Sequence, residues 1–223
     1  LFFFSMGFNN LIAWYSNVGR DGSQWNYLVD RINTLLGPVL VWIFSSTVVL
    51  NILSRSSNFP NYLTTSEDGI MPSIEFILWP LWLVSIYLVM VLFAPLTIFL
   101  HKKYPYATVL ILFTMTVLVD NIEFSLNFSY IKLFNYLFFW IAIHQLGYFY
   151  ADGKIQEVNL NVFRYLTVFS YGYLFYQISV SNKYLSLASY RLSSLNNEDP
   201  PTTLYLVASI GLISLAFTLK NLI

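Results

Sequence analysis

Seven apolar segments make up most of this 223-residue chain, and together they contain only two strongly ionisable side chains, His144 and Arg164. The segments cover residues 1–16, 34–53, 76–100, 107–119, 133–150, 162–180 and 202–219. A charged side chain at the centre of a bilayer costs at least about 2.5 kcal/mol, so helices in hydrocarbon avoid charge in this way. The sequence therefore predicts an all-α fold, a polytopic transmembrane helical bundle with about seven helices.

Composition excludes several classes of function. Charged residues make up only 10% of the chain, and 11 Lys and Arg balance 11 Asp and Glu. This balance argues against a nucleic-acid partner, which needs a basic surface. Without cysteine and with only two histidines, a thiolate or multi-His metal centre is not expected. The GxGxxG, GxSxG and GxxxxGKS fingerprints are absent as well, so the lipid bilayer is the first partner that the sequence predicts.

Two of the apolar segments are shorter than about 17 residues, the lower limit for a spanning helix. Segment 1–16 begins at Leu1 inside an apolar run, with neither Met nor a basic leader before it, so we expect further sequence upstream. Segment 107–119 would cover only about 20 Å at about 1.5 Å per residue. It continues past Asp120, lies short among its neighbours, or does not cross the membrane.

Lys and Arg in the loops predict the orientation, because cytoplasmic loops carry an excess of them. One set of alternate loops and ends holds Arg20, Arg31, Lys102, Lys103, Lys154, Arg164 and Lys220, whereas the other holds Arg55, Lys132, Lys183 and Arg191. The bias predicts a multi-pass protein of the cell membrane whose first loop and C-terminal end are cytoplasmic.

The first segment, LFFFSMGFNN, places polar and small residues on an otherwise apolar helix. Small residues such as Ser5 and Gly7 let helices approach closely, and Asn9 and Asn10 can form hydrogen bonds across a helix interface. The alternative is that these side chains bind a ligand. Both interpretations stay open at the level of sequence.

Arg31 lies in DRINTLLGP, just before the second apolar segment on the expected cytoplasmic side. Most arginines in such positions are anchors whose charged end reaches the membrane surface. A cytosolic ligand that carries phosphate would also favour a guanidinium there, because its geometry matches two phosphate oxygens.

His144 is the most informative single residue, because an ionisable side chain within a membrane helix is a functional hypothesis by default. It lies in FNYLFFWIAIHQLGYFYADG, with Trp140 and Tyr148 one turn away on either side of the same helix face. The alternative is that neutral His144, together with Gln145, forms hydrogen bonds with a neighbouring helix. Asp152 and the glycine after it indicate the turn that ends this helix.

Five segments in this order resemble the membrane acyltransferase type three family, in particular its bacterial branch of multi-pass O-acyltransferases. They are FFFSMG, DRINTLLGP, WPLWLVSIYLVMVLFAPL, NYLFFWIAIHQLGYFYADG and NNEDPPTTLYL, and the likeness covers roughly residues 1–211. The resemblance implies a membrane enzyme of about ten helices, of which this chain would be a single partial domain, 1–223, truncated at both ends. Such enzymes move an acyl group, often acetyl, from cytosolic acyl-CoA to a hydroxyl of a glycan or lipid-linked sugar, with no bound cofactor.

The resemblance also implies roles for individual residues. The family's FF-containing Ser/Gly motif corresponds to Phe3, Phe4, Ser5 and Gly7, and its proline-led aromatic span corresponds to Pro80, Leu81, Trp82 and Leu83. Its basic position before the third helix corresponds to Arg31, so the acyl-CoA phosphates would bind near Arg20 and Arg31. The family's catalytic Arg and His lie on its first helix, which we expect upstream of Leu1. His144 would then be a second proton carrier, a hydrogen-bond donor to the acceptor, or a packing residue.

Two alternatives to an enzyme remain. A non-catalytic relative or transporter-like protein could use the same helices to bind or flip a lipid, and a structural membrane subunit would need no site at all. Transporters often contain paired broken helices in two related halves. Pro80 and Pro95 lie in one apolar segment, and no other apolar segment contains two prolines, which counts against a transporter.

Overall fold

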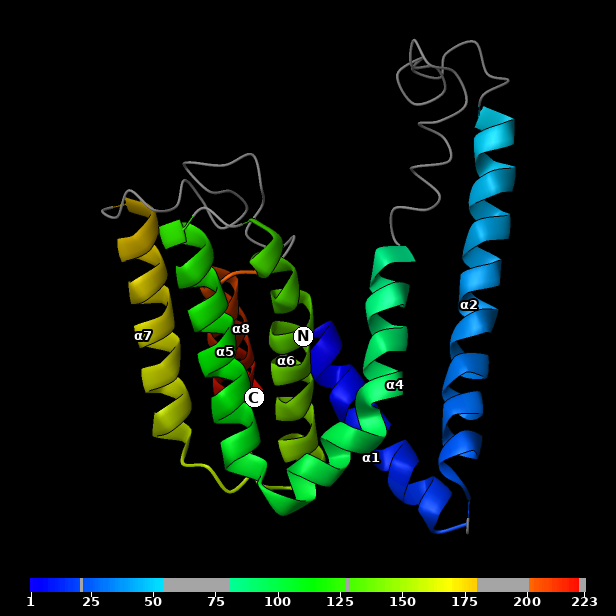
Figure 1. The fold of residues 1–223 in the computed structure, drawn as a ribbon, viewed down its shortest axis with the longest axis horizontal. Helices are drawn as coiled ribbons and strands as arrows, with labels where there is room; N and C mark the ends of the chain where they lie inside the picture. Colours follow the sequence, from blue (N-terminus) through cyan, green and yellow to red (C-terminus); the bar gives the residue numbers. More distant parts are fainter. Residues whose placement is uncertain (21, 54–80, 127–128, 180–200, 221–223) are drawn as a thin grey trace. The chain divides into compact units, whose positions relative to one another are not determined.

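The computed structural model describes residues 1–20, 22–53, 81–126, 129–179 and 201–220 (Figure 1). Within these ranges all regular structure is helical, which confirms the predicted all-α class. The helices are α1 (Phe2–Val18), α2 (Gln24–Leu53), α4 (Leu81–Lys103), α5 (Pro105–Leu126), the 3-10 helix η2 (Ser129–Phe134), α6 (Asn135–Ala151), α7 (Leu160–Ser179) and α8 (Thr203–Lys220).

Four helices in the described part of the chain are long and apolar enough to cross a bilayer. These stretches are Gln24–Val49, Leu81–Lys103, Pro105–Ile122 and Thr203–Lys220. Helices α1 and α6 are also apolar, but each has only 17 residues. The chain is therefore a membrane protein built as a polytopic transmembrane helical bundle.

Helix α5 settles the question that segment 107–119 left open. It extends from Pro105 to Leu126 and therefore continues past Asp120. Asp120 is fully buried, and its Oδ2 accepts a hydrogen bond from the backbone N–H of Thr203 at 3.4 Å. The apolar segment was predicted to end before Asp120 because this residue is charged. A buried carboxylate that has hydrogen-bond partners is nevertheless compatible with a continuous helix.

Helix α2 begins ten residues earlier than its apolar segment, because its first turns are polar. It starts at Gln24, so Arg31 lies inside the helix and not in a loop before it. The expectation that Arg31 belongs to the first loop is therefore wrong. Helix α4 contains Pro95, whereas Pro80 lies outside the described residues.

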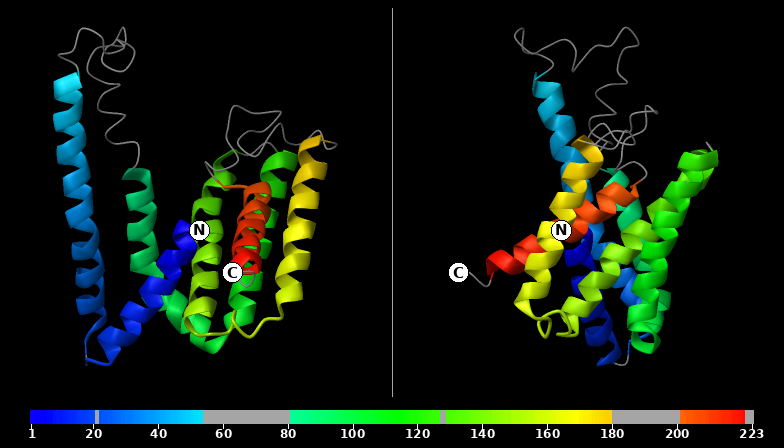
Figure 2. Two further views of the ribbon diagram at one scale, coloured as in Figure 1. Left: turned by 180° about the vertical axis from the view of Figure 1, so that it is seen from behind. Right: turned by 90° about the vertical axis from the view of Figure 1, so that its left-hand side faces the viewer.

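The chain divides into two compact units, which we describe separately. Unit 1 comprises residues 1–15 and 94–223, and unit 2 comprises residues 16–93. In unit 1, α5 packs against α6, η2 and α8, and α7 packs along α8 (Figures 1 and 2). In unit 2, α2 exposes large apolar side chains such as Leu40 and Phe44, as expected for a helix that faces lipid.

Helices α7 and α8 pack along each other in unit 1. Leu174 and Leu204 are buried between them and pack with Tyr173, Ile178, Val207 and Ala208. A Cβ atom at Gly211 would lie 2.9 Å from Cβ of Ser170, so this glycine permits the close approach of α8 to α7.

Candidate functional site

Helix α6 lies at the centre of unit 1 and carries the polar side chains of the candidate site. Residues 139–145 are all buried, and they cover about two helical turns, so every face of this part of α6 packs against protein. Within this stretch, His144 and Gln145 have no exposed surface. Buried polar groups of this kind need hydrogen-bond partners, because leaving one unsatisfied costs about 1–3 kcal/mol.

His144 receives its partner from α1. The side-chain amide of Asn10 donates a hydrogen bond from Nδ2 to Nε2 of His144, at 3.0 Å. With Asn10 as the donor, the neutral imidazole carries its proton on Nδ1. Nδ1 is buried and has no hydrogen-bond partner among the described residues. The ring therefore presents a buried donor that its protein neighbours do not use.

The close packing of α1 on α6 depends on two glycines. A Cβ atom at Gly7 would collide with the backbone carbonyl of His144, and a Cβ atom at Gly147 would collide with the backbone carbonyl of Phe4. Only glycine lets two helix backbones approach this closely. Gly7 and Asn10 thus form the helix contacts that the packing interpretation predicts, whereas Asn9 is exposed.

The remaining residues of the FFFSMG motif divide between interior and surface. Phe3 is buried with its ring centroid 4.0 Å from that of Trp140, and Phe4 is buried 5.7 Å from the ring of Tyr150. Ser5 is exposed, so its small side chain is not part of this interface. The structure thus brings Phe3, Phe4 and Gly7 to α6 and leaves Ser5 at the surface.

Tyr148 lies one turn beyond His144 and connects α6 to α4. Its ring centroid lies 4.8 Å from that of His144 and 5.4 Å from that of His101. The hydroxyls of Tyr148 and Thr97 share a hydrogen bond at 3.0 Å, and Nε2 of Gln145 donates to the Thr97 carbonyl at 3.0 Å. Both histidines of the chain therefore flank one tyrosine that is itself fully buried.

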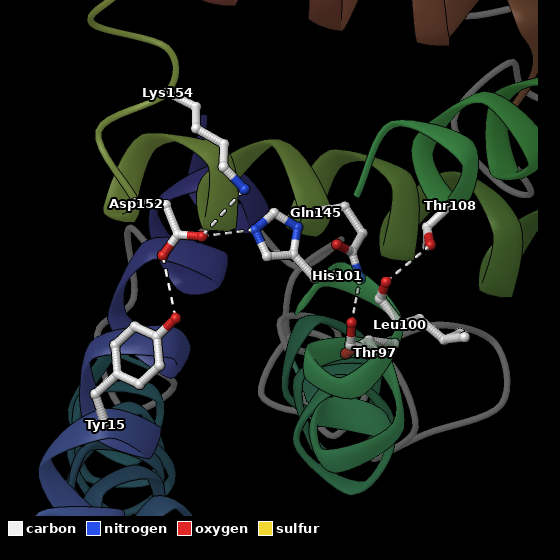
Figure 3. A network of polar contacts seen from close by, with 8 residues as sticks. All are labelled: Tyr15, Thr97, Leu100, His101, Thr108, Gln145, Asp152 and Lys154. Carbon is white, nitrogen blue, oxygen red and sulfur yellow. Dashed lines mark hydrogen bonds and ion pairs between the residues drawn. The ribbon is translucent and has the colours of Figure 1, made fainter. Parts of the chain in front are cut away.

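His101 forms a pair with Asp152 that was not predicted from the sequence. Nε2 of His101 donates to Oδ2 of Asp152 at 3.1 Å, and the His101 side chain is fully buried (Figure 3). Asp152 also accepts a hydrogen bond from the Tyr15 hydroxyl at 3.2 Å and lies 3.5 Å from Nζ of Lys154. One carboxylate thus joins α1, α4 and the segment after α6.

The local backbone explains the position of Asp152. It is the C-cap of α6, and its N–H donates to the Tyr148 carbonyl. Gly153 follows with a φ of 78°, a left-handed conformation that ends helices and favours glycine. The expected turn is confirmed. In addition, the Asp152 carboxylate forms the contacts with α1 and α4 described above. A sequence signal was present, since His101 is an ionisable residue at the end of an apolar span.

We expect Asp152→Asn to lower the free energy of unfolding by about 1–3 kcal/mol, because hydrogen bonds to a charged group are the stronger ones. Thermal denaturation of the detergent-solubilised protein measures this, and each kcal/mol corresponds to about 2–4 °C for a chain of this size. Glu157→Gln removes an exposed carboxylate from the same loop and serves as the control. Equal melting temperatures for the two variants would contradict a stabilising role for Asp152.

A second polar cluster lies where α5, η2 and α8 meet. Lys132, which we expected in a loop on the non-cytoplasmic side, is fully buried on η2, and Asp120 and Asn135 are fully buried as well. Nδ2 of Asn135 donates to the Thr116 carbonyl at 3.3 Å. Lys132 does lie in the connection between α5 and α6, as expected, but η2 packs against α5 and the side chain is buried.

The remaining candidate residues, Arg20, Arg31 and Trp82, belong to unit 2. Arg20 lies 3.7 Å from Asp30 in an ion pair in which both side chains are largely exposed, and its Nε donates to the Ser16 carbonyl at 3.3 Å. Exposed pairs contribute about 0–1 kcal/mol, so Arg20 can exchange its partner easily. Arg31 lies beside Tyr87 of α4, and Trp82 is partly buried in α4.

Among the described residues, no group of three or more His, Cys, Asp or Glu side chains could hold a metal ion. The ionisable side chains that unit 1 buries or pairs include His144, the His101–Asp152 pair, Asp120 and Lys132. No protein-family model, curated protein or solved structure matches the chain.

Proposed function

We propose that this chain forms part of a membrane-bound acyltransferase, which moves an acyl group, often acetyl, from acyl-CoA to a hydroxyl of a glycan or lipid-linked sugar. One observation carries the proposal. Two of the five segments that resemble type three acyltransferases, FFFSMG and NYLFFWIAIHQLGYFYADG, pack directly on each other at Gly7 and Gly147. Their contact encloses His144, an ionisable residue of the second segment.

The reaction needs a base and a hydrogen-bond donor. In acyl transfer, the acceptor oxygen bonds to the thioester carbonyl carbon, the C–S bond breaks, and the hydroxyl proton passes to a base and then to the CoA thiolate. A donor aimed at the developing negative charge accelerates such a step. His144 fits the second role, because in the tautomer that accepts from Asn10 it offers a buried Nδ1–H.

In this proposal the protein lies in the cell membrane, and the donor substrate, acyl-CoA, enters the site from the cytoplasm. In this proposal the end of unit 2 that carries Arg20 faces the cytoplasm, and Arg20 and Arg31 bind the CoA phosphates. The exposed side chain of Arg20 supports this role, since its weak pair with Asp30 leaves the guanidinium accessible to an anion. Trp82 of α4 is the aromatic candidate for contact with the substrate in the same unit.

The coding sequence upstream of Leu1 offers the cheapest test. An apolar span that carries an Arg and, roughly three turns later, a His would supply the base that the proposed reaction requires. A span without this pair would instead favour a non-catalytic relative.

An assay on the intact protein tests the activity itself. We expect membranes that contain the protein to transfer label from acetyl-CoA labelled in its acetyl group to a glycan or lipid-linked sugar, with equal release of free CoA thiol. Membranes from cells without the gene serve as the control. Correctly inserted protein that yields neither product with hydroxyl-bearing acceptors would contradict the proposal.

A non-catalytic, transporter-like protein that binds a lipid or small molecule is the second candidate. The observation that favours it is the complete burial of His144, because a reacting substrate has to reach Nδ1. Binding of an unreacted acceptor without release of CoA thiol in the assay above would distinguish this candidate from the enzyme.

A further inference from the structure

An apolar groove of about 260 Å³ lies between α5 and α6 in unit 1. Its wall on α5 consists of Tyr106, Val109, Leu110 and Phe113, whose spacing places them on one helix face. Leu146 and Phe149 of α6 form the opposite wall, and Ile155 of the following segment completes the lining. The groove therefore lies at the ends of α5 and α6 that are close to the His101–Asp152 pair.

The lining favours a hydrocarbon chain over water. Apart from the Tyr106 hydroxyl, every lining side chain is apolar, so water in the groove would find almost no hydrogen-bond partner. Tyr106 is 72% exposed and Leu110 is 67% exposed, which shows that the groove is open on the surface of unit 1. In a membrane protein, such an open apolar surface meets lipid.

The charges near the groove specify the headgroup. Lys102 and Lys103 are the last two residues of α4, and one residue separates them from α5. Both are exposed, form no ion pair within the described ranges, and lie over the rings of Tyr15 and Tyr104, respectively. Nζ of Lys154 lies 5.4 Å from the ring centroid of Phe149, a lining residue, and 3.5 Å from Oδ2 of Asp152, with which it forms a partly exposed ion pair. Basic side chains beside a cleft between membrane helices attract anionic headgroups.

We propose that this groove binds one acyl chain of an anionic phospholipid, and that Lys102, Lys103 and Lys154 hold the phosphate of its headgroup. The site is separate from the Asn10–His144 contact, and the proposal does not depend on acyl transfer. The bound lipid bridges α5 and α6 at the membrane surface, where both helices end.

Photo-crosslinking with lipids of defined headgroup tests the proposal. The intact protein is reconstituted into phosphatidylcholine vesicles that contain a small fraction of phosphatidylglycerol with a diazirine in one acyl chain, and mass spectrometry locates the cross-links. We expect cross-links in residues 106–113 and 146–155. An otherwise identical phosphatidylcholine probe should label these residues at least about fivefold less. This factor is the gain in affinity for an anionic headgroup that a single lysine provides.

Two pairs of variants give the proposal its controls. Val109→Trp fills the groove and should lower the phosphatidylglycerol cross-link about tenfold, whereas Ile111→Trp, on the same helix but outside the lining, should leave it unchanged. Replacing Lys102, Lys103 and Lys154 together by Gln should remove the headgroup preference. Lys220→Gln should not do so.

Three outcomes would overturn the proposal. Equal losses in Val109→Trp and Ile111→Trp would show ordinary contact with bulk lipid. An unchanged headgroup preference in the triple Gln variant would exclude the lysines. Displacement of the probe by palmitoyl-CoA, but not by unlabelled phosphatidylglycerol, would assign the groove to an acyl-CoA instead.

Discussion

Replacing His144 with Ala in the intact protein is expected to lower the rate of acyl transfer by about 10²–10³-fold, the typical effect of removing one donor to a developing negative charge. The rate of label transfer from acetyl-CoA, divided by the amount of inserted protein, measures this effect. Tyr165→Ala serves as the control, because Tyr165 is 74% exposed on α7 and should not affect the rate.

A paired substitution separates catalysis from packing at this position. His144→Ala alone also leaves Asn10 without its partner, which costs stability in addition to activity. Replacing both members of the hydrogen bond by apolar residues, as in Asn10→Val with His144→Leu, can be nearly neutral for stability. We expect this double variant to insert and melt like the wild type and to remain inactive. Wild-type activity in the double variant would remove His144 from the mechanism.

Gly147→Ala and Gly7→Ala are expected to lower the free energy of unfolding by about 3 kcal/mol each, the upper end of what overpacking usually costs. The added methyl group meets backbone atoms of the facing helix, which cannot move aside as a flexible side chain can. For a chain of this size, the loss corresponds to roughly 6–12 °C in the melting temperature. Thermal denaturation of the solubilised protein measures it.

Gly172→Ala provides a matched control for both glycine variants. Gly172 lies inside α7, and a Cβ atom there would meet no atom within 4 Å. Because Ala favours helix over Gly by about 1 kcal/mol, this variant should melt at the same or a higher temperature. If all three variants melted alike, α1 would not pack on α6 through these glycines.

The fold class could be predicted because long apolar segments without charge are what helices in the hydrocarbon core of a bilayer require. The bounds of the helices were less predictable. Hydropathy identifies the part of a helix that lies in lipid, but it does not identify helical residues that are polar or that are buried against other helices. Helix α5 shows the difference, since Asp120 ends the apolar segment but is buried inside a longer helix. Arg31 shows the opposite case, because the polar first turns of α2 are helical without being apolar.

The candidate site was predictable only in its individual residues. His144 is conspicuous as an ionisable residue within an apolar segment, and Asn10 as a polar residue that can bond across helices. The pairing of His101 with Asp152 spans 51 positions and depends on how α4 meets α6, which no local pattern contains. The role of Ser5 was equally undetermined, since a small residue near Gly7 can face either a helix or the surface.

The bond between Asn10 and His144 also sets an order for biogenesis. The two residues are 134 positions apart, so at about 5–20 residues per second the ribosome needs roughly 7–27 s to make one after the other. During this interval α1 is in place, but α6, the helix on which it packs, has not yet been synthesised. Helix α6 has only 17 residues and carries three buried amide or imidazole side chains, Asn135, His144 and Gln145, so it inserts most easily after its neighbours are in place. Helix α1 is thus completed by a residue of α6 that is synthesised 134 positions later.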